Sequence, residues 1–253
     1  MSITANSLIN DSFNFFKNHL SCLFTLSLIS ASISLILYYF LIPFDEIVTI
    51  IKNINSQKNL TSLLTWIKQL SEEEIALIIK VSFLSLISIF IGLILLISSI
   101  ITYLSEFSKN NEINALQSFI LSLNMLPNML MLLLICTIII YFGFMLFILP
   151  GVILAIGFSL SPIILITNKN IRILKAISQS CRIAFYHWWL ILLILLLLLA
   201  LQILLTILLE QFYFLSNIIR NIISFTLNNL LISFVLIYFF RLCMLVEKSE
   251  VKK

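Results

Sequence analysis

Six apolar stretches, each about twenty residues long and without a charge in its middle, constrain this chain more than any other feature. A bilayer core about 30 Å thick needs about 20 apolar helical residues to cross it. Within lipid, only helices and closed barrels satisfy the hydrogen bonds of their own backbone. The sequence therefore predicts an all-α, polytopic integral membrane protein with about six transmembrane helices. The expected spans cover residues 20–42, 82–104, 129–149, 151–167, 188–209 and 222–245.

The composition agrees with a protein that lies almost entirely in the membrane. The chain is 61% hydrophobic and only 10% charged, whereas soluble domains are about 25% charged. Nearly every residue belongs to an expected span or a short connection, so we expect a single membrane domain over residues 1–253. The net charge of +4 is small and scattered, which argues against a nucleic-acid partner.

The distribution of lysine and arginine predicts the orientation. If both termini face the cytoplasm, ten of these cations lie on the cytoplasmic side and five on the exported side. Because membrane insertion retains positive charge inside the cell, we expect cytoplasmic N- and C-termini. The one long connection, residues 43–81, is then exported. Within it, Ser71 and Glu74 match a capping box, with Ser71 as the N-cap, which predicts a helix that continues into the second span.

Two prolines interrupt the middle of the chain. The third and fourth spans are joined by Leu149, Pro150 and Gly151, a connection short enough only for a tight helical hairpin. Proline begins or ends helices and glycine adopts positive φ, so we expect the turn at Pro150 and Gly151. The fourth span is short and contains Pro162, which predicts a kinked, thin or re-entrant helix. Pro150, Gly151 and Pro162 are therefore a candidate broken-helix segment.

Three polar-to-amphipathic segments precede spans, at residues 2–20, 110–128 and 168–188. An amphipathic helix lies in the headgroup plane with its apolar side buried, so we expect cytoplasmic interfacial helices. Two interpretations stay open: three tandem units of one design, or unrelated helices of a common kind. The expected apolar face of the first segment comprises Leu8, Ile9, Ser12, Phe13, Phe16 and Leu20. That of the third comprises Ile173, Ile177, Cys181, Ala184 and Trp188.

The strongest local signal is the basic face of the third segment. Arg172, Lys175 and Arg182 recur at helical spacing, and Trp188 and Trp189 follow. A cation near an anionic leaflet contributes about 1 kcal/mol, and tryptophan favours the headgroup level. These residues either recognise anionic lipid headgroups or only anchor the helix and set its topology.

The sequence predicts no catalytic, cofactor or metal site. No ionisable residue lies near the middle of a span, which argues against an ion-coupled pump. No P-loop, nucleophile elbow or zinc-protease motif is present. We expect His19 and His187 to be ordinary interfacial residues, and Gln202 to form a hydrogen bond across helices. The four cysteines have no metal-site spacing, and we expect them to be packing residues: Cys22, Cys136, Cys181 and Cys243.

Several motifs resemble the YciC family of bacterial inner-membrane proteins. They are the opening residues 1–5 with Asn14-Phe15-Phe16, the central run 149–153 with Leu160-Ser161-Pro162, and the last span, 236–245. The resemblance implies a multi-pass inner-membrane protein of uncharacterised function and supplies no catalytic residue. We therefore expect a non-enzymatic envelope or membrane accessory component whose partners are the bilayer and other membrane proteins. The alternative is a passive transporter or a lipid-handling protein.

Overall fold

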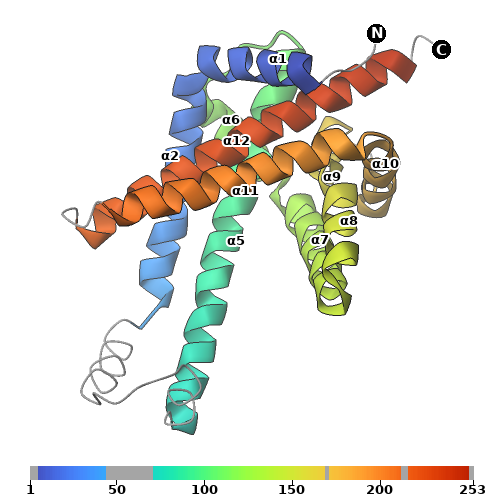
Figure 1. The fold of residues 1–253 in the computed structure, drawn as a ribbon. Helices are drawn as coiled ribbons and strands as arrows, with labels where there is room; N and C mark the ends of the chain where they lie inside the picture. Colours follow the sequence, from blue (N-terminus) through green and yellow to red (C-terminus); the bar gives the residue numbers. More distant parts are fainter. Residues whose placement is uncertain (1–4, 44–70, 169–170, 212–215, 251–253) are drawn as a thin grey trace. The chain divides into compact units, whose positions relative to one another are not determined.

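The computed structural model describes residues 5–43, 71–168, 171–211 and 216–250, and all regular structure within these ranges is helical. Six helical segments there are long and apolar enough to cross a bilayer, α8 and α9 together counting as one, in agreement with the predicted fold class. The helices, labelled in Figure 1, are α1 (Ala5–Asn18), α2 (Leu20–Leu41), α5 (Glu72–Ser108), α6 (Ala115–Leu123), α7 (Leu126–Leu146), α8 (Ile148–Phe158), α9 (Ser161–Thr167), α10 (Ile173–Tyr186), α11 (Trp188–Glu210) and α12 (Asn217–Glu250).

The predicted capping box at the start of α5 is confirmed. The Ser71 amide donates a hydrogen bond to Glu74 Oε2 at 2.9 Å, and the Glu74 amide donates to Ser71 Oγ at 3.2 Å. This reciprocal pair satisfies two amides that a helix start leaves without partners. The helix then continues without interruption through the second expected span to Ser108. The remainder of the expected exported loop, residues 44–70, lies outside the described residues.

The chain divides into two compact units, residues 32–92 and the remainder. Both boundaries fall inside helices, one in α2 and one in α5, and the single-domain expectation stays a prediction. In the smaller unit, the serines of α5 bond within their own helix: Ser82 Oγ donates to Ile78 O, and Ser88 Oγ donates to Leu84 O. A hydroxyl satisfied in this way can lie in an apolar environment without a partner from another helix.

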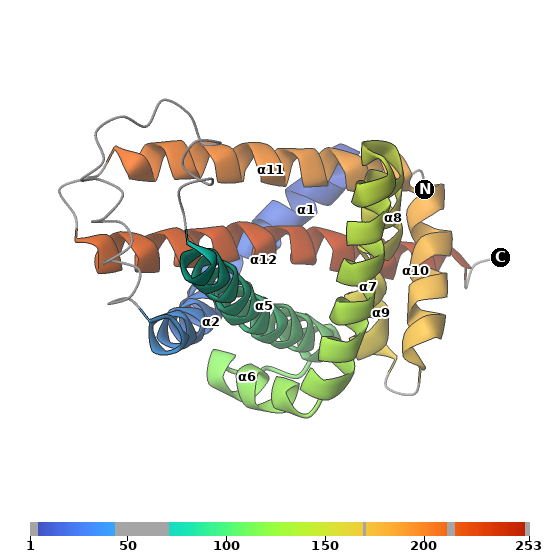
Figure 2. The same cartoon turned by 90° about the horizontal axis from the view of Figure 1, so that it is seen from below.

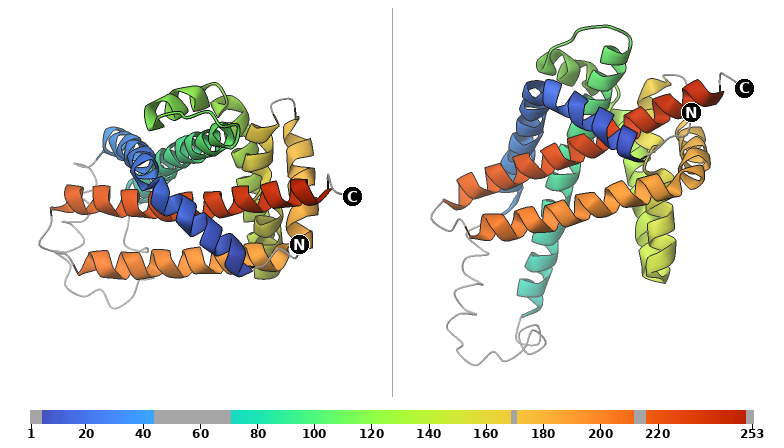
Figure 3. Two further views of the ribbon diagram at one scale, coloured as in Figure 1. Left: turned by 90° about the horizontal axis from the view of Figure 1, so that it is seen from above. Right: turned by 45° about the horizontal axis from the view of Figure 1, so that its top comes forward.

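In the larger unit, α11 and α12 pack antiparallel, and α1 lies across α12 (Figures 2 and 3). Tyr238 of α12 is almost fully buried, and its hydroxyl donates to Leu190 O of α11 at 3.4 Å. The α7–α8 hairpin runs steeply across the α11–α12 pair (Figures 1 and 2), so these four helices do not form a parallel bundle. Helix α10 packs on α8 and α9.

Packing within the larger unit buries part of the expected apolar face of α1, together with Phe15 beside it. Leu8, Ser12 and Phe15 are buried, whereas Phe13 is 54% exposed. The Phe15 ring also meets the Phe107 ring of α5, with centroids 5.3 Å apart. An exposed Phe13 is compatible with the expected contact of this face with lipid, so the interfacial position of α1 stays a prediction.

The predicted position of the α7–α8 turn was wrong. The turn lies at Phe147, which has extended backbone angles (φ −161°, ψ 158°) between the two helices. Pro150 instead occupies the first turn of α8, where its missing amide proton costs no helical hydrogen bond. Gly151 does not adopt positive φ. Its absent side chain permits close approach, because a Cβ there would overlap the Phe144 ring of α7.

The fourth span is interrupted between α8 and α9. Leu160 is the N-cap of α9, and Pro162 follows in its first turn. Ser161 Oγ donates to Phe158 O at 2.5 Å, and the Ile163 amide donates to Leu160 O at 3.1 Å. Polar backbone at an interruption is tolerated where neighbouring protein groups satisfy and cover it, and the α9 residues from Ser161 to Ile166 are all buried.

Candidate functional site

The predicted basic face lies on the exposed side of α10. Arg172 is the N-cap of this helix, and Arg172, Lys175 and Arg182 are all exposed. Lys169, the preceding cation of the same segment, lies outside the described residues. The structure therefore brings the three predicted cations onto one accessible face.

The opposite side of α10 is held by small residues. Ala176, Ser180 and Ala184 are buried, and Ser180 Oγ donates a hydrogen bond to Gly157 O of α8 at 2.6 Å. Small side chains at every fourth position let two helix backbones approach closely. Of the expected apolar face, Ala184 is buried while Ile173 and Ile177 are partly buried, and the interfacial position of α10 stays a prediction. The i, i+4, i+8 spacing of Ala176, Ser180 and Ala184 was the signal that could have identified the contact between α10 and α8.

The junction between α10 and α11 carries aromatic residues. His187 ends α10 and precedes α11, and the Tyr186 ring lies edge-on to it with centroids 4.8 Å apart. Burial lowers the pKa of the His187 imidazole. Trp188 and Trp189 are 49% and 60% exposed, with ring centroids 5.3 Å apart. Exposed indoles beside a basic helix are typical of a segment at the headgroup level.

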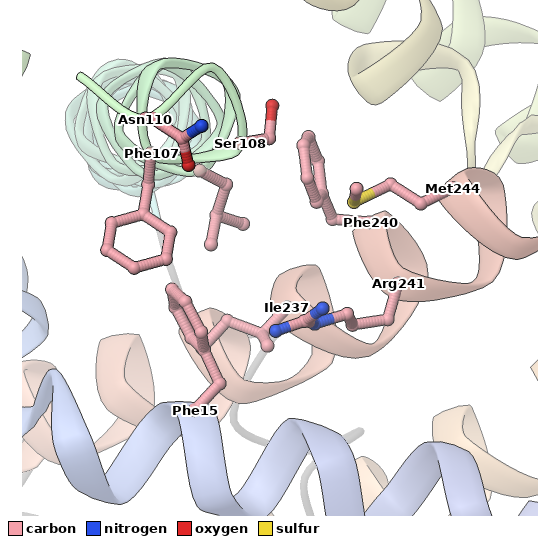
Figure 4. A pocket seen from close by; sticks show the side chains of 9 residues that line it. Phe15, Phe107, Ser108, Asn110, Ile237, Phe240, Arg241 and Met244 are labelled. Atoms are coloured by element: carbon pink, nitrogen blue, oxygen red, sulfur yellow. The ribbon is translucent and has the colours of Figure 1, made fainter.

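A pocket lies elsewhere in the larger unit, between α1, the end of α5 and α12 (Figure 4). It has a volume of about 190 Å³ and contains one cation, Arg241. The Arg241 Cζ atom lies 5.4 Å from the Phe15 ring centroid, which is a cation–π contact. In the sequence, Arg241 is only one of the ten cations expected on the cytoplasmic side, and no local pattern predicts the pocket. The lining residues are Phe15, Leu104, Phe107, Ser108, Asn110, Ile237, Phe240, Arg241 and Met244.

His19 packs behind the aromatic wall of this pocket. Its ring stacks on Phe15 with centroids 4.3 Å apart, and its Nδ1 lies 2.8 Å from the Tyr103 hydroxyl of α5. Phe107 meets the same imidazole edge-on at 4.7 Å. Burial lowers the pKa of His19. Among the described residues, no group of three or more histidine, cysteine or acidic side chains could hold a metal ion.

A buried amide joins α12 to α2 where the sequence argument placed none. Asn229 Nδ2 donates to Ser30 Oγ at 2.8 Å and to Ser27 O at 3.2 Å. Asn229 is 8% exposed, so its amide needs these partners. Gln202, the residue expected to bond across helices, forms no side-chain hydrogen bond within the described part of the chain. Because asparagine is frequent throughout this sequence, Asn229 alone did not predict a hydrogen bond between helices.

Comparison with known proteins finds relatives along the whole chain. The model of the uncharacterised protein family UPF0259 matches residues 1–245. A UPF0259 membrane protein of Yersinia pestis (strain Pestoides F) is 36% identical over 257 aligned residues that cover 100% of both chains. A UPF0259 membrane protein of Yersinia pseudotuberculosis serotype O:3 (strain YPIII) has the same identity and coverage. No solved structure matches the chain at significant similarity.

Proposed function

Because the chain belongs to the uncharacterised UPF0259 family of membrane proteins, which confirms its resemblance to the YciC family, we propose that it is a non-enzymatic accessory component of the bacterial inner membrane. Both termini face the cytoplasm, and α10 contacts anionic lipid headgroups there. The charge distribution supports this orientation, since ten of the fifteen lysines and arginines then lie on the cytoplasmic side.

The observation that carries the proposal is the two-sided character of α10. One side is attached to α8 through Ala176, Ser180 and Ala184, and the other presents Arg172, Lys175 and Arg182. Because the helix is already ordered by its contact with α8, lipid contact does not have to order it. Three cations near an anionic leaflet would each contribute about 1 kcal/mol. This is enough to bias the lipids that surround the protein without a deep binding site.

The test measures the lipids around the full-length protein in reconstituted vesicles that contain phosphatidylglycerol and phosphatidylcholine. Spin-labelled lipids should show preference for phosphatidylglycerol in the wild type. That preference should fall when Arg172, Lys175 and Arg182 are all changed to glutamine. The control changes Lys17 and Lys248 to glutamine, since both are exposed cations outside α10 that the proposed topology places on the same side. An equal loss in the control, or no loss in the α10 variant, contradicts the proposed role of α10.

The accessory role is tested by co-purification. The tagged wild-type chain should retain a specific membrane-protein partner after mild detergent extraction. A sample of the same chain unfolded before the extraction should not recover that partner. A catalytic turnover by the purified chain would contradict the non-enzymatic part of the proposal.

The interruption between α8 and α9 favours a second candidate, a passive transporter or lipid-handling protein. Broken helices supply polar backbone at membrane depth in transporters. Substrate-dependent flux in vesicles that is lost in Pro162→Ala would support this candidate. Gly151 is unsuitable for the same test, because any side chain there meets Phe144. An absence of flux across a broad panel of solutes and lipids would leave the accessory role as the better explanation.

A further inference from the structure

We propose that the Arg241 pocket binds the anionic end of an amphiphile, a phosphate or carboxylate group that carries an apolar chain. This site is separate from the basic face of α10 and does not depend on the function proposed for it. Its walls come from α1, the end of α5 and α12, three elements of the larger unit (Figure 4).

The polar part of the pocket calls for an anion. Arg241 is the one charged residue among the lining side chains, and within the described residues its guanidinium has no ion pair and no hydrogen bond. The Phe15 ring contacts this cation but offers no lone pair for its N–H donors. Glu106, a carboxylate close to the pocket in sequence, already binds Lys109 Nζ at 2.8 Å and Asn111 Nδ2 at 2.8 Å. A planar guanidinium with available donors matches the paired oxygens of a phosphate or carboxylate.

The polar residues that line the pocket with Arg241 also favour an anionic ligand. The side chains of Ser108 and Asn110 line the pocket opposite Arg241 in Figure 4. Asn110 adopts the left-handed conformation, with φ of 62°, directly after α5 ends. The Asn110 amide can donate a hydrogen bond to a second oxygen of the anion, whereas the Ser108 hydroxyl already donates to Ser105 O at 2.7 Å.

The remaining walls call for an apolar group attached to that anion. Three aromatic rings, those of Phe15, Phe107 and Phe240, share the lining with Leu104, Ile237 and Met244. A free phosphate would gain nothing from these surfaces, and a neutral lipid would leave the guanidinium without a partner. The volume of about 190 Å³ is below the range of about 300–1,000 Å³ for drug-sized ligands. The pocket therefore fits a headgroup and the first part of a chain, with the rest of the chain outside.

The experiment uses the full-length protein purified in an uncharged detergent and measures binding by titration calorimetry. The probes are dihexanoyl phosphatidic acid, decanoate, zwitterionic dihexanoyl phosphatidylcholine and inorganic phosphate. The two anionic amphiphiles should bind more tightly than the zwitterionic lipid and inorganic phosphate. Arg241→Gln should weaken the binding of both by roughly ten- to a hundredfold, since it removes charge-assisted hydrogen bonds. Lys248→Gln, which removes an exposed cation of the same helix, should leave it unchanged.

A second variant keeps the proposal testable if Arg241→Gln does not fold. Met244→Trp retains the cation but fills part of the cavity, and it should also lose amphiphile binding while its circular dichroism stays that of the wild type. The α10 triple glutamine variant should bind both amphiphiles like the wild type, which separates this proposal from the preceding one. Tight binding of inorganic phosphate equal to that of phosphatidic acid would overturn the amphiphile and indicate a site for free phosphate. No binding of any probe, or full binding by Arg241→Gln, would overturn the site itself.

Discussion

Gly143 and Gly151 hold the two helices of the α7–α8 hairpin together by having no side chains. A Cβ on Gly143 would lie 3.1 Å from Gly151 Cα and 2.7 Å from Leu154 Cδ1. The leucine methyl can move, but the backbone contact can be relieved only if the helices separate.

We therefore expect Gly143→Ala to lower the free energy of unfolding by about 1–3 kcal/mol, the usual cost of overpacking. Gly151→Ala should be destabilising as well, and the added change Phe144→Ala should recover part of the loss, because the Phe144 ring is what the new Cβ meets. Gly157→Ala is the milder comparison, since its Cβ would lie 3.3 Å from Cys181 Sγ. Thermal unfolding in detergent measures all four variants. A Gly143→Ala protein as stable as the wild type would contradict the close approach.

The two histidines predict a pH dependence of stability. Burial lowers the pKa of both His19 and His187, whereas an unfolded histidine titrates near pH 6.5. Below about pH 6.5 the unfolded state therefore binds more protons than the folded state, and the stabilising contribution is lost as the pH falls. Unfolding temperatures measured from pH 8 to pH 5 should decline in the wild type. The decline should be smaller in a protein with both His19→Gln and His187→Gln, and an identical pH profile would show that other groups cause it.

Helix α10 shows how one element combines a structural and an accessible face. Ser180 contacts Gly157 so closely that a larger side chain would force α10 away from α8. Ser180→Leu should lower the free energy of unfolding by about 1–3 kcal/mol through overpacking, and Ser180→Ala by about 0.5–1.5 kcal/mol through the lost hydrogen bond. Leu174→Ser should change it by less than about 0.5 kcal/mol, since Leu174 is 73% exposed.

Hydrogen exchange of the α10 amides provides the measurement. Ser180→Leu should accelerate exchange across residues 173–186 and leave the α11–α12 pair protected. Uniform acceleration through all helices would mean that the substitution unfolds the protein as a whole and does not detach α10.

The starts and interruptions of helices were more predictable than their packing. The Ser71–Glu74 capping box was identifiable because its two hydrogen bonds join residues three positions apart. The helix break near Pro162 also follows from a local property, the missing amide proton of proline. The α7–α8 turn was misplaced because proline is also favoured in the first turn of a helix. Only the structure shows that the turn precedes Pro150.

At the scale of the whole molecule, the testable prediction is the topology. Fusion of alkaline phosphatase to the C-terminus should give an inactive enzyme, because this enzyme requires export, and fusion of green fluorescent protein there should give a fluorescent one. A phosphatase inserted within residues 43–81 should be active. If reporter fusions place the two chain ends on opposite sides of the membrane, the number of crossings is odd. One of the six candidate spans then does not cross, and α8–α9 is the first to examine.

The sequence by itself determined that this chain is helical and lies in a membrane, because span length and apolar composition are local quantities that bilayer thickness makes decisive. The small-residue face of α10, the buried Asn229 and the pocket at Arg241 were decided only by the tertiary structure. Each of them depends on two or three segments far apart in the chain meeting at one point. Because both lipid and the protein core favour apolar side chains, periodicity does not distinguish the side of a transmembrane helix that faces lipid from the side that faces protein.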